Sequence, residues 1–325
     1  MKILTNYNEI ITMFYLSKLI YDYHENDSFD LNINEKIFNY VKRINNDFEN
    51  GLHNIVFINI KNALLFLSNN YPKSIFQDFI SNDKTDIQVG IILSNNNICI
   101  VFKGTDSLID CYYDLNFMKR HIDTSNIEIH KGFFQQIMSI YNELLNSIQK
   151  LLQKNPNLYI YITGHSAGAA QGTIFAYLIS KVFNNKLIKL ITFGGPKVGN
   201  YEWSTTFNKI KNIIHYRITN EGDIITKVPN FEYYHVGINL HLTTHNIHIF
   251  KEPICCSKEY CMKEWCNNYD DELIDNPNNC IIYNLLSKFN YLNIYNHNIH
   301  NYYINLINKQ EIINDICDRR QLSSF

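Results

Sequence analysis

Short apolar runs alternate with longer stretches of helical spacing along most of this chain. The apolar runs are rich in β-branched residues and predict buried strands. They are residues 86–94, 98–104, 158–163, 187–195 and 212–219. Residues 131–154 carry apolar side chains at every third or fourth position, which predicts a long amphipathic helix, and a second helix is expected over 167–182. Strands that alternate with helices predict an α/β fold with a mostly parallel sheet.

The two ends of the pattern differ from its middle. Apolar residues between Ile10 and Ile20 recur at helical spacing, which predicts an amphipathic helix packed on the core rather than a signal peptide. Residues 232–242 and 245–250 predict a late hairpin. We therefore expect an N-terminal helical segment, residues 1–84, packed on an α/β domain that spans residues 85–325.

Composition narrows the class of protein. The 325 residues are 46% hydrophobic and 18% charged, with a formal net charge of −2, so a sizeable core is expected and no basic excess points to nucleic acid. No apolar run approaches the roughly 20 residues that cross a bilayer. These values predict a globular protein with no transmembrane segment and no nucleic-acid partner.

Five of the eight cysteines crowd into residues 255–280. They lack the CxxC pairs of a zinc site, so a loop closed by disulfides is the preferred interpretation. Disulfides persist in oxidising compartments. The absence of a recognisable signal peptide conflicts with that compartment, and the localisation stays open.

The stretch Gly164-His165-Ser166-Ala167-Gly168 follows a predicted strand and opens a predicted helix. In this context G-x-S-x-G forms a sharp turn that exposes a serine nucleophile at the edge of a sheet. The N–H group of Ala167 would point into the same space and could bind an oxyanion. Ser166 is therefore the candidate nucleophile.

A serine nucleophile needs a base, and the base needs an orienting acid. In this fold class the acid follows the serine in the chain, and the histidine follows the acid. Asp223 lies in the loop after the strand 212–219 and is preferred over its neighbour Glu221. Downstream histidines are His235, His241, His245, His248, His297 and His300. The segment 296–306 precedes a terminal amphipathic helix and suits the base best, so His297 and His300 both remain candidates.

Several stretches together resemble the class 3 lipases, the fungal-type triacylglycerol lipases of the α/β-hydrolase fold. They are VFKGTDSLIDCYYDLNF, IHKGFF, YITGHSAGAAQGTIFA, ITFGGPKVGN, YRITNEGDIITKVP and HNYY, in the family's order over about residues 85–305. The resemblance implies Ser166 as nucleophile, Asp223 as acid and His300 as base. His300 and Tyr303 reproduce the family's H-x-x-Y, whereas His297 has no tyrosine at that spacing.

The resemblance also implies the oxyanion hole and a lid. Thr105 in FKGT matches the residue that forms one half of the oxyanion hole, and Ala167 supplies the other half. The mostly apolar segment 107–117 matches a lid that opens at a lipid surface, although a core-packed helix is the alternative. The chain departs from the family at three positions, where Lys103, Thr226 and Ile299 replace an arginine, a proline and an aspartate.

The activity implied is hydrolysis of fatty-acyl esters of glycerol through an acyl-enzyme, with no metal or organic cofactor. The substrate would be a lipid at an oil–water or membrane interface. The same site could serve a phospholipase, a galactolipase or an acyltransferase. A catalytically silent lipid-binding protein is the alternative from a different class. The family's relatives often carry a disulfide loop between acid and base, where this chain has its cysteine cluster.

Overall fold

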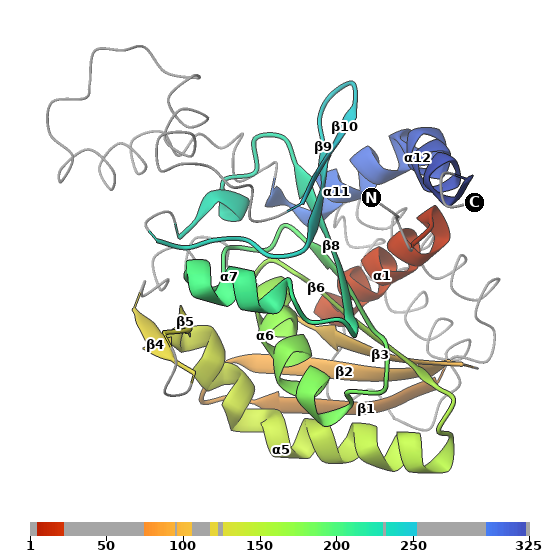
Figure 1. The fold of residues 1–325 in the computed structure, drawn as a ribbon. Coiled ribbons are helices and arrows are strands. Elements are labelled where there is room, and N and C mark those ends of the chain that lie inside the picture. Colours follow the sequence, from red (N-terminus) through yellow and green to blue (C-terminus); the bar gives the residue numbers. More distant parts are fainter. Residues whose placement is uncertain are drawn as a thin grey trace, which may run out of the picture.

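An eight-stranded sheet forms the centre of the computed structural model, which describes residues 5–22, 75–94, 96–105, 118–122, 126–229, 232–251 and 297–322. Its order is β1-β2-β3-β6-β7-β8-β9-β10 (Figure 1). The strands are β1 (Ile75–Asn82), β2 (Ile87–Ser94), β3 (Asn97–Phe102), β6 (Tyr159–His165), β7 (Ile188–Phe193), β8 (Ile213–Asn220), β9 (Ile238–Leu242) and β10 (Ile247–Lys251). The pairs from β3 to β9 are parallel, and the outer pairs are antiparallel. The predicted mostly parallel α/β sheet is confirmed.

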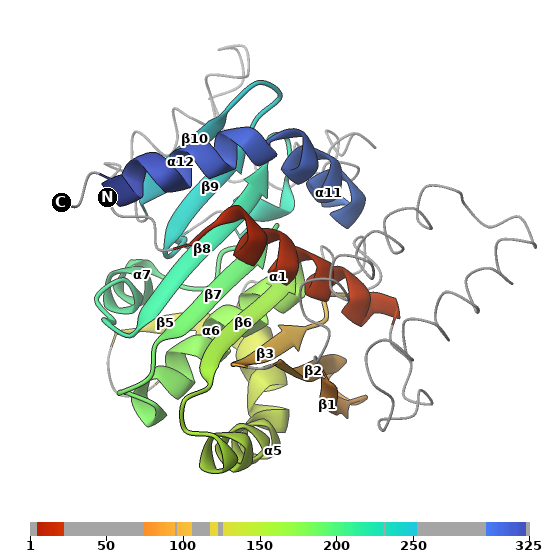
Figure 2. The same ribbon diagram turned by 90° about the vertical axis from the view of Figure 1, so that its right-hand side faces the viewer.

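Helices cover both faces of this sheet (Figure 2). Helices α5 (Lys131–Lys154) and α6 (Ala167–Val182) pack on one face, and α7 (Tyr201–Phe207) lies near them beside the ribbon β4 (Lys119–His121) and β5 (Glu128–His130). The other face carries α1 (Tyr7–Leu19), α11 (Ile299–Asn308) and α12 (Gln310–Leu322). Two single-turn 3₁₀ helices, η1 (Ile20–Asp22) and η2 (Ile225–Lys227), complete the described elements.

The sheet separates two hydrophobic clusters because strand side chains alternate between its faces. In β6, Ile160 and Ile162 face the cluster under α5 and α6. Tyr161 belongs to the opposite cluster, together with the apolar residues of α1 and α11. The sheet is thus buried on both sides, which explains why its central strands read as nearly continuous apolar runs.

Two features differ from the sequence expectations. Strand β1 lies inside the segment 1–84 that was predicted to be helical, and it pairs with β2 at the edge of the sheet. Helix α1 is buried at every position from Ile10 to Ser17, not along one stripe. It lies between the sheet and the C-terminal helices α11 and α12, so neighbours surround it and an all-round apolar helix results.

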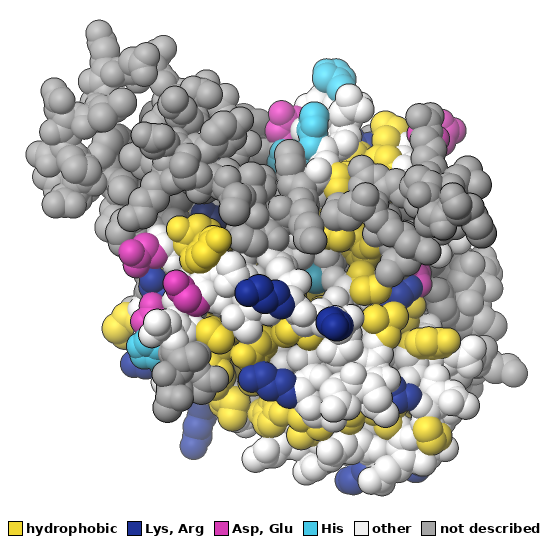
Figure 3. All heavy atoms as spheres, in the orientation of Figure 1, with side chains coloured by type: hydrophobic (Ala, Val, Ile, Leu, Met, Phe, Trp, Pro, Cys, Tyr) yellow, Lys and Arg dark blue, Asp and Glu magenta, His cyan; other side chains and the backbone are white. Residues whose placement is uncertain are grey.

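Exposed histidines gather at one place on the described surface. Histidine side chains lie at the tip of the β9–β10 hairpin, where His245 and His248 are exposed (Figure 3). No helix in the described part of the chain is both long and apolar enough to cross a bilayer.

Candidate active site

Ser166 occupies a sharp turn between β6 and α6. Its backbone has φ 58° and ψ −128°, a conformation that non-glycine residues rarely adopt. The turn brings Gly164 and Gly168 together, because a Cβ on Gly164 would lie 2.5 Å from the backbone of Gly168. A Cβ on Gly168 would lie 2.4 Å from the carbonyl oxygen of Phe102 in β3. Both glycines are therefore needed for this close approach of backbones.

The Ser166 hydroxyl is available for chemistry. Ser166 holds the N-cap position of α6, yet its side chain makes no capping hydrogen bond, and its Oγ has no hydrogen-bond partner among the described residues. The first-turn amides of a helix have no acceptor within the helix. The N–H of Ala167 is one of these amides, and it lies next to the serine.

Thr105 follows β3 and reaches the same place through its neighbour Gly104. A Cβ on Gly104 would lie 3.2 Å from Cβ of Ser166 and 2.5 Å from the carbonyl oxygen of His165. The backbone at Gly104 thus contacts the turn that carries Ser166. Thr105 is partly exposed and is the next residue along.

Asp223 lies in the loop after β8 and is fully buried. The N–H of Ile225 donates to Asp223 Oδ1 at 2.9 Å, and the Thr226 hydroxyl donates to the Asp223 carbonyl at 2.8 Å. Glu221, the sequence competitor, is instead turned toward the β9–β10 hairpin, where it accepts hydrogen bonds from Thr244. Those hydrogen bonds lower the pKa of Glu221. The loop therefore presents Asp223 to the interior and Glu221 to the surface.

The imidazole paired with Asp223 belongs to His297. Its Nδ1 lies 3.0 Å from Oδ1 and 2.9 Å from Oδ2 of the carboxylate, and both side chains are fully buried. A carboxylate only accepts, so Nδ1 carries the proton and Nε2 keeps a lone pair. That Nε2 has no hydrogen-bond partner in the described part of the chain.

The sequence-based choice of His300 as base is corrected by this contact. His300 lies in the first turn of α11, and Tyr302 of the same helix donates its hydroxyl to Asp223 Oδ2 at 2.6 Å. Positions two apart on a helix are separated by about 200°, so positions 300 and 302 fall on opposite faces of α11. The H-x-x-Y spacing selected Tyr303, which packs on Phe14 and Tyr15 of α1 instead.

Ser166 and His297 both lie against the end of β7, and no hydrogen bond joins Ser166 Oγ to His297 Nε2. The N–H of Ser166 donates to the carbonyl of Phe193 at 3.0 Å. The next residue, Gly194, has φ +59°, and a Cβ there would lie 3.1 Å from His297 Cε1 and 3.2 Å from Asp223 Oδ2. Residues 193 and 194 therefore contact the serine backbone on one side and the Asp–His pair on the other.

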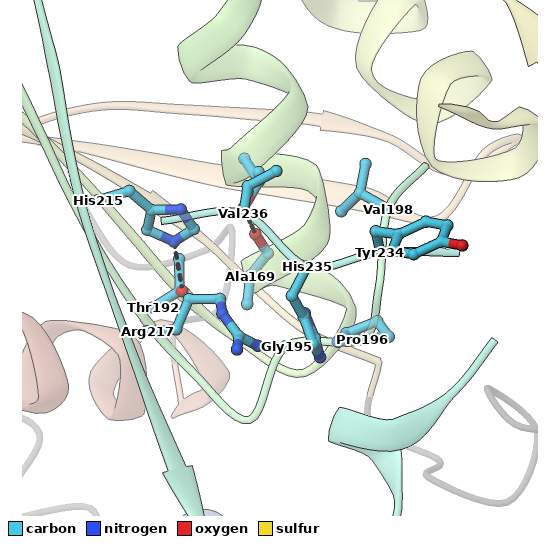
Figure 4. A pocket seen from close by; sticks show the side chains of 11 residues that line it. Ala169, Thr192, Gly195, Pro196, Val198, His215, Arg217, Tyr234, His235 and Val236 are labelled. Atoms are coloured by element: carbon cyan, nitrogen blue, oxygen red, sulfur yellow. Dashed lines mark hydrogen bonds between the residues drawn. The ribbon is translucent and has the colours of Figure 1, made fainter. Parts of the chain in front are cut away.

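A small cavity lies beside the acid loop, between the ends of β7 and β8 and the first turn of α6 (Figure 4). His235 donates from Nε2 to the carbonyl of Thr226 at 2.6 Å, and His215 Nε2 lies 3.0 Å from the Thr192 hydroxyl. Burial lowers the pKa of both histidines well below the usual value, and nearby Arg217 lowers it further. The neutral His215 imidazole thus joins β8 to β7, and the neutral His235 imidazole holds the segment that follows Asp223.

Two sequence predictions lie outside the described residues. They are the lid over 107–117 and the disulfide loop over 255–280. Cys99 is a free cysteine that is buried in β3, and burial raises the pKa of its thiol to about 12. No cluster of metal-ligating side chains occurs among the described residues.

Comparison with known proteins agrees with this geometry. Residues 99–233 match the family described as Lipase (class 3), a range that runs from β3 through the serine turn and the acid loop. Residues 99–233 are called the class 3 lipase region below because of this match. A lipase of Rhizomucor miehei is 30% identical to this chain over 155 residues, which cover 44% of this chain and 41% of the relative.

The chain also resembles a plant enzyme. Phospholipase A(1) DAD1 of Arabidopsis thaliana is 30% identical over 168 residues, which cover 46% of this chain and 37% of the relative. The chain thus spans less than half the length of these curated relatives.

A solved structure extends the likeness beyond the class 3 lipase region. A triacylglycerol lipase, described as having a serine protease triad as its catalytic centre, aligns with a TM-score of 0.58 and 20% identity over 74% of this chain and 83% of its own. At that identity the likeness establishes the fold.

Proposed function

We propose that this protein is a serine ester hydrolase in which Ser166 is the nucleophile, His297 the general base and Asp223 the orienting acid. The observation that carries the proposal is the buried Asp223–His297 pair, whose imidazole has its Nε2 lone pair free of any described hydrogen bond. The class 3 lipase region supplies the serine and the acid of this set.

The proposed reaction follows from the tautomer of His297, in which Nδ1–H faces Asp223 and Nε2 can accept a proton. His297 Nε2 takes the proton of the Ser166 hydroxyl as Oγ attacks the ester carbonyl. Asp223 fixes the Nδ1–H tautomer and stabilises the imidazolium that forms. The alcohol leaves with the proton from His297, and a water that is deprotonated by His297 then hydrolyses the acyl-enzyme.

The oxyanion of the tetrahedral intermediate would be held by two backbone amides. The N–H of Ala167 at the start of α6 is one, and the N–H of Thr105 beside Gly104 is the other. Both are fixed in place before substrate arrives, because each belongs to backbone packed against the serine turn. Preorganised donors of this kind typically contribute a factor of about 10² to 10³ each.

The substrate class that fits best is a fatty-acyl ester of glycerol, since the Rhizomucor relative is a lipase. A phospholipase is the second candidate, because the DAD1 relative is a phospholipase A(1) with the same 30% identity. The acyl ester is common to both substrates, and the headgroup is not.

The nucleophile can be tested with two readouts. Ser166→Ala should abolish hydrolysis of short-chain nitrophenyl esters and labelling by a fluorophosphonate probe, with circular dichroism and melting temperature close to those of the parent. Ser139→Ala, an exposed serine of α5 whose hydroxyl bonds to Gln136 and Thr85, is the matched control and should keep both activities. Undiminished hydrolysis in Ser166→Ala would refute the proposal.

The two substrate candidates are separated by a panel of triolein, phosphatidylcholine and a nitrophenyl ester. Faster release of fatty acid from triolein supports the lipase, and faster release from phosphatidylcholine supports the phospholipase. Both activities should disappear together in Ser166→Ala.

A further inference from the structure

A ladder of polar contacts joins α1 to β6 along their whole length. Glu9, Ser17 and, in η1, Tyr21 contact residues on one face of the strand; Glu9 and Ser17 are eight residues apart, and Ser17 and Tyr21 are four apart. The Tyr161 hydroxyl donates to Glu9 at 2.8 Å, the Ser17 and Thr163 hydroxyls lie 2.8 Å apart, and the Tyr21 hydroxyl lies 3.0 Å from His165 Nδ1. The Thr163 hydroxyl also lies 3.3 Å from the carbonyl oxygen of Met13, the residue between Glu9 and Ser17 at the same spacing.

The last step of the ladder matches on the two elements, from Ser17 to Tyr21 on the helical side and from Thr163 to His165 on the strand. Four residues of an α-helix rise about 6 Å, and two residues of a strand rise about 6.7 Å. The strand partners Tyr161, Thr163 and His165 are two apart and share one face of the strand, and both Met13 and Ser17 contact Thr163. The ladder therefore ends at His165, the residue next to the nucleophile.

His165 extends the ladder to the base. Its Nε2 lies 3.0 Å from the backbone carbonyl oxygen of His297, and the two rings stack with centroids 4.7 Å apart and planes 27° apart. A carbonyl oxygen only accepts, so His165 Nε2 carries a proton. Burial lowers the pKa of His165 far below its usual value, and the charge of His297 lowers it further, so the ring is neutral and Nδ1 is an acceptor. The Tyr21 hydroxyl must therefore be the donor to Nδ1.

We infer that the Tyr21–His165 pair is a positioning relay, through which the N-terminal helix fixes the backbone and ring plane of His297 for proton transfer with Ser166. This inference rests on the proposed function. Neither residue forms a hydrogen bond to Ser166 Oγ or His297 Nε2. Tyr21 sets the His165 tautomer, and the Nε2–H of His165 holds the carbonyl of His297.

The neutral charge of His165 also suits a residue that positions His297. His297 becomes an imidazolium during the reaction, and a cation stacked on it at 4.7 Å would oppose that charge. A neutral His165 avoids the repulsion and still donates one hydrogen bond. An aromatic residue at position 165 would keep the stacking and lose the donor.

The relay is tested with Tyr21→Phe, which removes one hydroxyl and keeps the ring. Hydrolysis of a soluble nitrophenyl ester should show kcat reduced between about 10- and 100-fold, because a small misplacement of a catalytic group has effects of that size. KM should stay within about twofold. Ser17→Ala is the matched control: it breaks the neighbouring rung of the same ladder without contacting His165, and its kcat should equal that of the parent.

A second pair of variants separates the hydrogen bond from packing. His165→Gln can place an N–H near the position of Nε2, and His165→Leu cannot. The relay predicts that kcat of His165→Gln exceeds that of His165→Leu by about tenfold, the usual effect of one hydrogen bond. Equal rates in the two variants at similar melting temperatures would overturn it.

Failure of the relay and failure of the proposed function give different results. A parent that hydrolyses esters through Ser166, with kcat unchanged in Tyr21→Phe, refutes the relay and leaves the function standing. A parent without esterase activity refutes the function, and ¹⁵N NMR of the histidine rings then decides the relay. Tyr21→Phe should shift the ring signals of both His165 and His297, and Ser17→Ala should not; an unchanged His297 signal in Tyr21→Phe would overturn the relay.

Discussion

Asp223 is the residue on which the hydrogen bonds of the site converge. Its buried carboxylate accepts from His297 Nδ1, from the Tyr302 hydroxyl and from the N–H of Ile225. Burial of a charge is costly unless hydrogen bonds compensate for it. Burial and the Asp223 charge raise the pKa of Tyr302 well above its usual value, so this hydroxyl stays protonated and donates.

The two candidate bases are separated by single substitutions. His297→Gln should lower kcat by about 10³-fold or more, because the serine loses its proton acceptor. His300→Gln should retain activity within about threefold, because the imidazole at Asp223 is that of His297. The measurement is kcat on a soluble ester, and the opposite ranking of the two variants would restore His300 as the base.

Tyr302 offers a prediction on the acid. Tyr302→Phe removes one donor from a buried carboxylate and should lower the free energy of unfolding by about 1.5 to 3 kcal/mol, the usual range for hydrogen bonds to charged groups. We expect kcat to fall about tenfold, since Asp223 orients His297 less firmly. Urea unfolding and ester hydrolysis measure the two effects. Tyr303→Phe, whose ring packs on α1, is the control and should leave kcat unchanged.

The serine turn depends on contacts between secondary-structure elements. Strand β6, helix α6 and the end of β3 approach so closely at Gly164 and Gly168 that no side chain fits between them. The strained Ser166 backbone persists because the elements on either side fix it. The packing of these three elements, and not the turn alone, therefore fixes the position of Ser166.

Gly168→Ala tests this packing. The new Cβ would lie 2.4 Å from the backbone oxygen of Phe102, so β3 or α6 must shift, and overpacking of this kind typically costs about 1 to 3 kcal/mol. Gly172→Ala lies one turn further along α6, where the nearest atoms are side-chain atoms at 3.2 and 3.3 Å. Thermal unfolding should show the larger loss for Gly168→Ala; equal losses would mean that the backbone contact is unimportant.

Hydrophobic periodicity predicted the central strands and the helices α5 and α6 because their burial patterns are strong. It missed β1, whose polar residues come in the pairs Gln77-Asp78 and Ser81-Asn82 and break the alternation expected of a strand. The serine and the acid followed from local motifs, and the structure brings Asp223 to an imidazole. His297 could not be chosen from spacing, because two histidines and two adjacent tyrosines fit the same segment. Only the direction of Tyr302 from α11 toward Asp223 distinguishes them.

Buried histidines are a feature of the whole molecule. His130, His165, His215 and His235 come from different elements, and burial lowers the pKa of each. His130 caps α5 by accepting from the N–H of Phe133, and its pKa falls from 6.5 to about 4. A neutral ring is required for that acceptor role.

Acid should destabilise the fold through these residues. In the unfolded chain His130 binds a proton below about pH 6.5, whereas in the folded chain it does so only below about pH 4. The free energy of unfolding therefore falls as the pH drops from 6.5 to 4. Each such histidine contributes a slope of about 1.4 kcal/mol per pH unit. Urea unfolding at pH 7 and pH 5 should show a smaller difference in His130→Asn than in the parent. His245→Gln, an exposed residue of the hairpin turn, should match the parent.

The contacts of Ser17 with Thr163 and of Tyr21 with His165 fix the number of residues that can lie between positions 17 and 21. A single residue inserted between Ser17 and Tyr21 would rotate everything after it by about 100° and carry the phenol off the strand face. The contacts of Glu9 and Ser17 with β6 would stay in place, so the helix would remain packed on the strand. His165, the residue next to Ser166, would lose its hydrogen bond to Tyr21. Length variation in this helix is therefore tolerable at its beginning and harmful near its end.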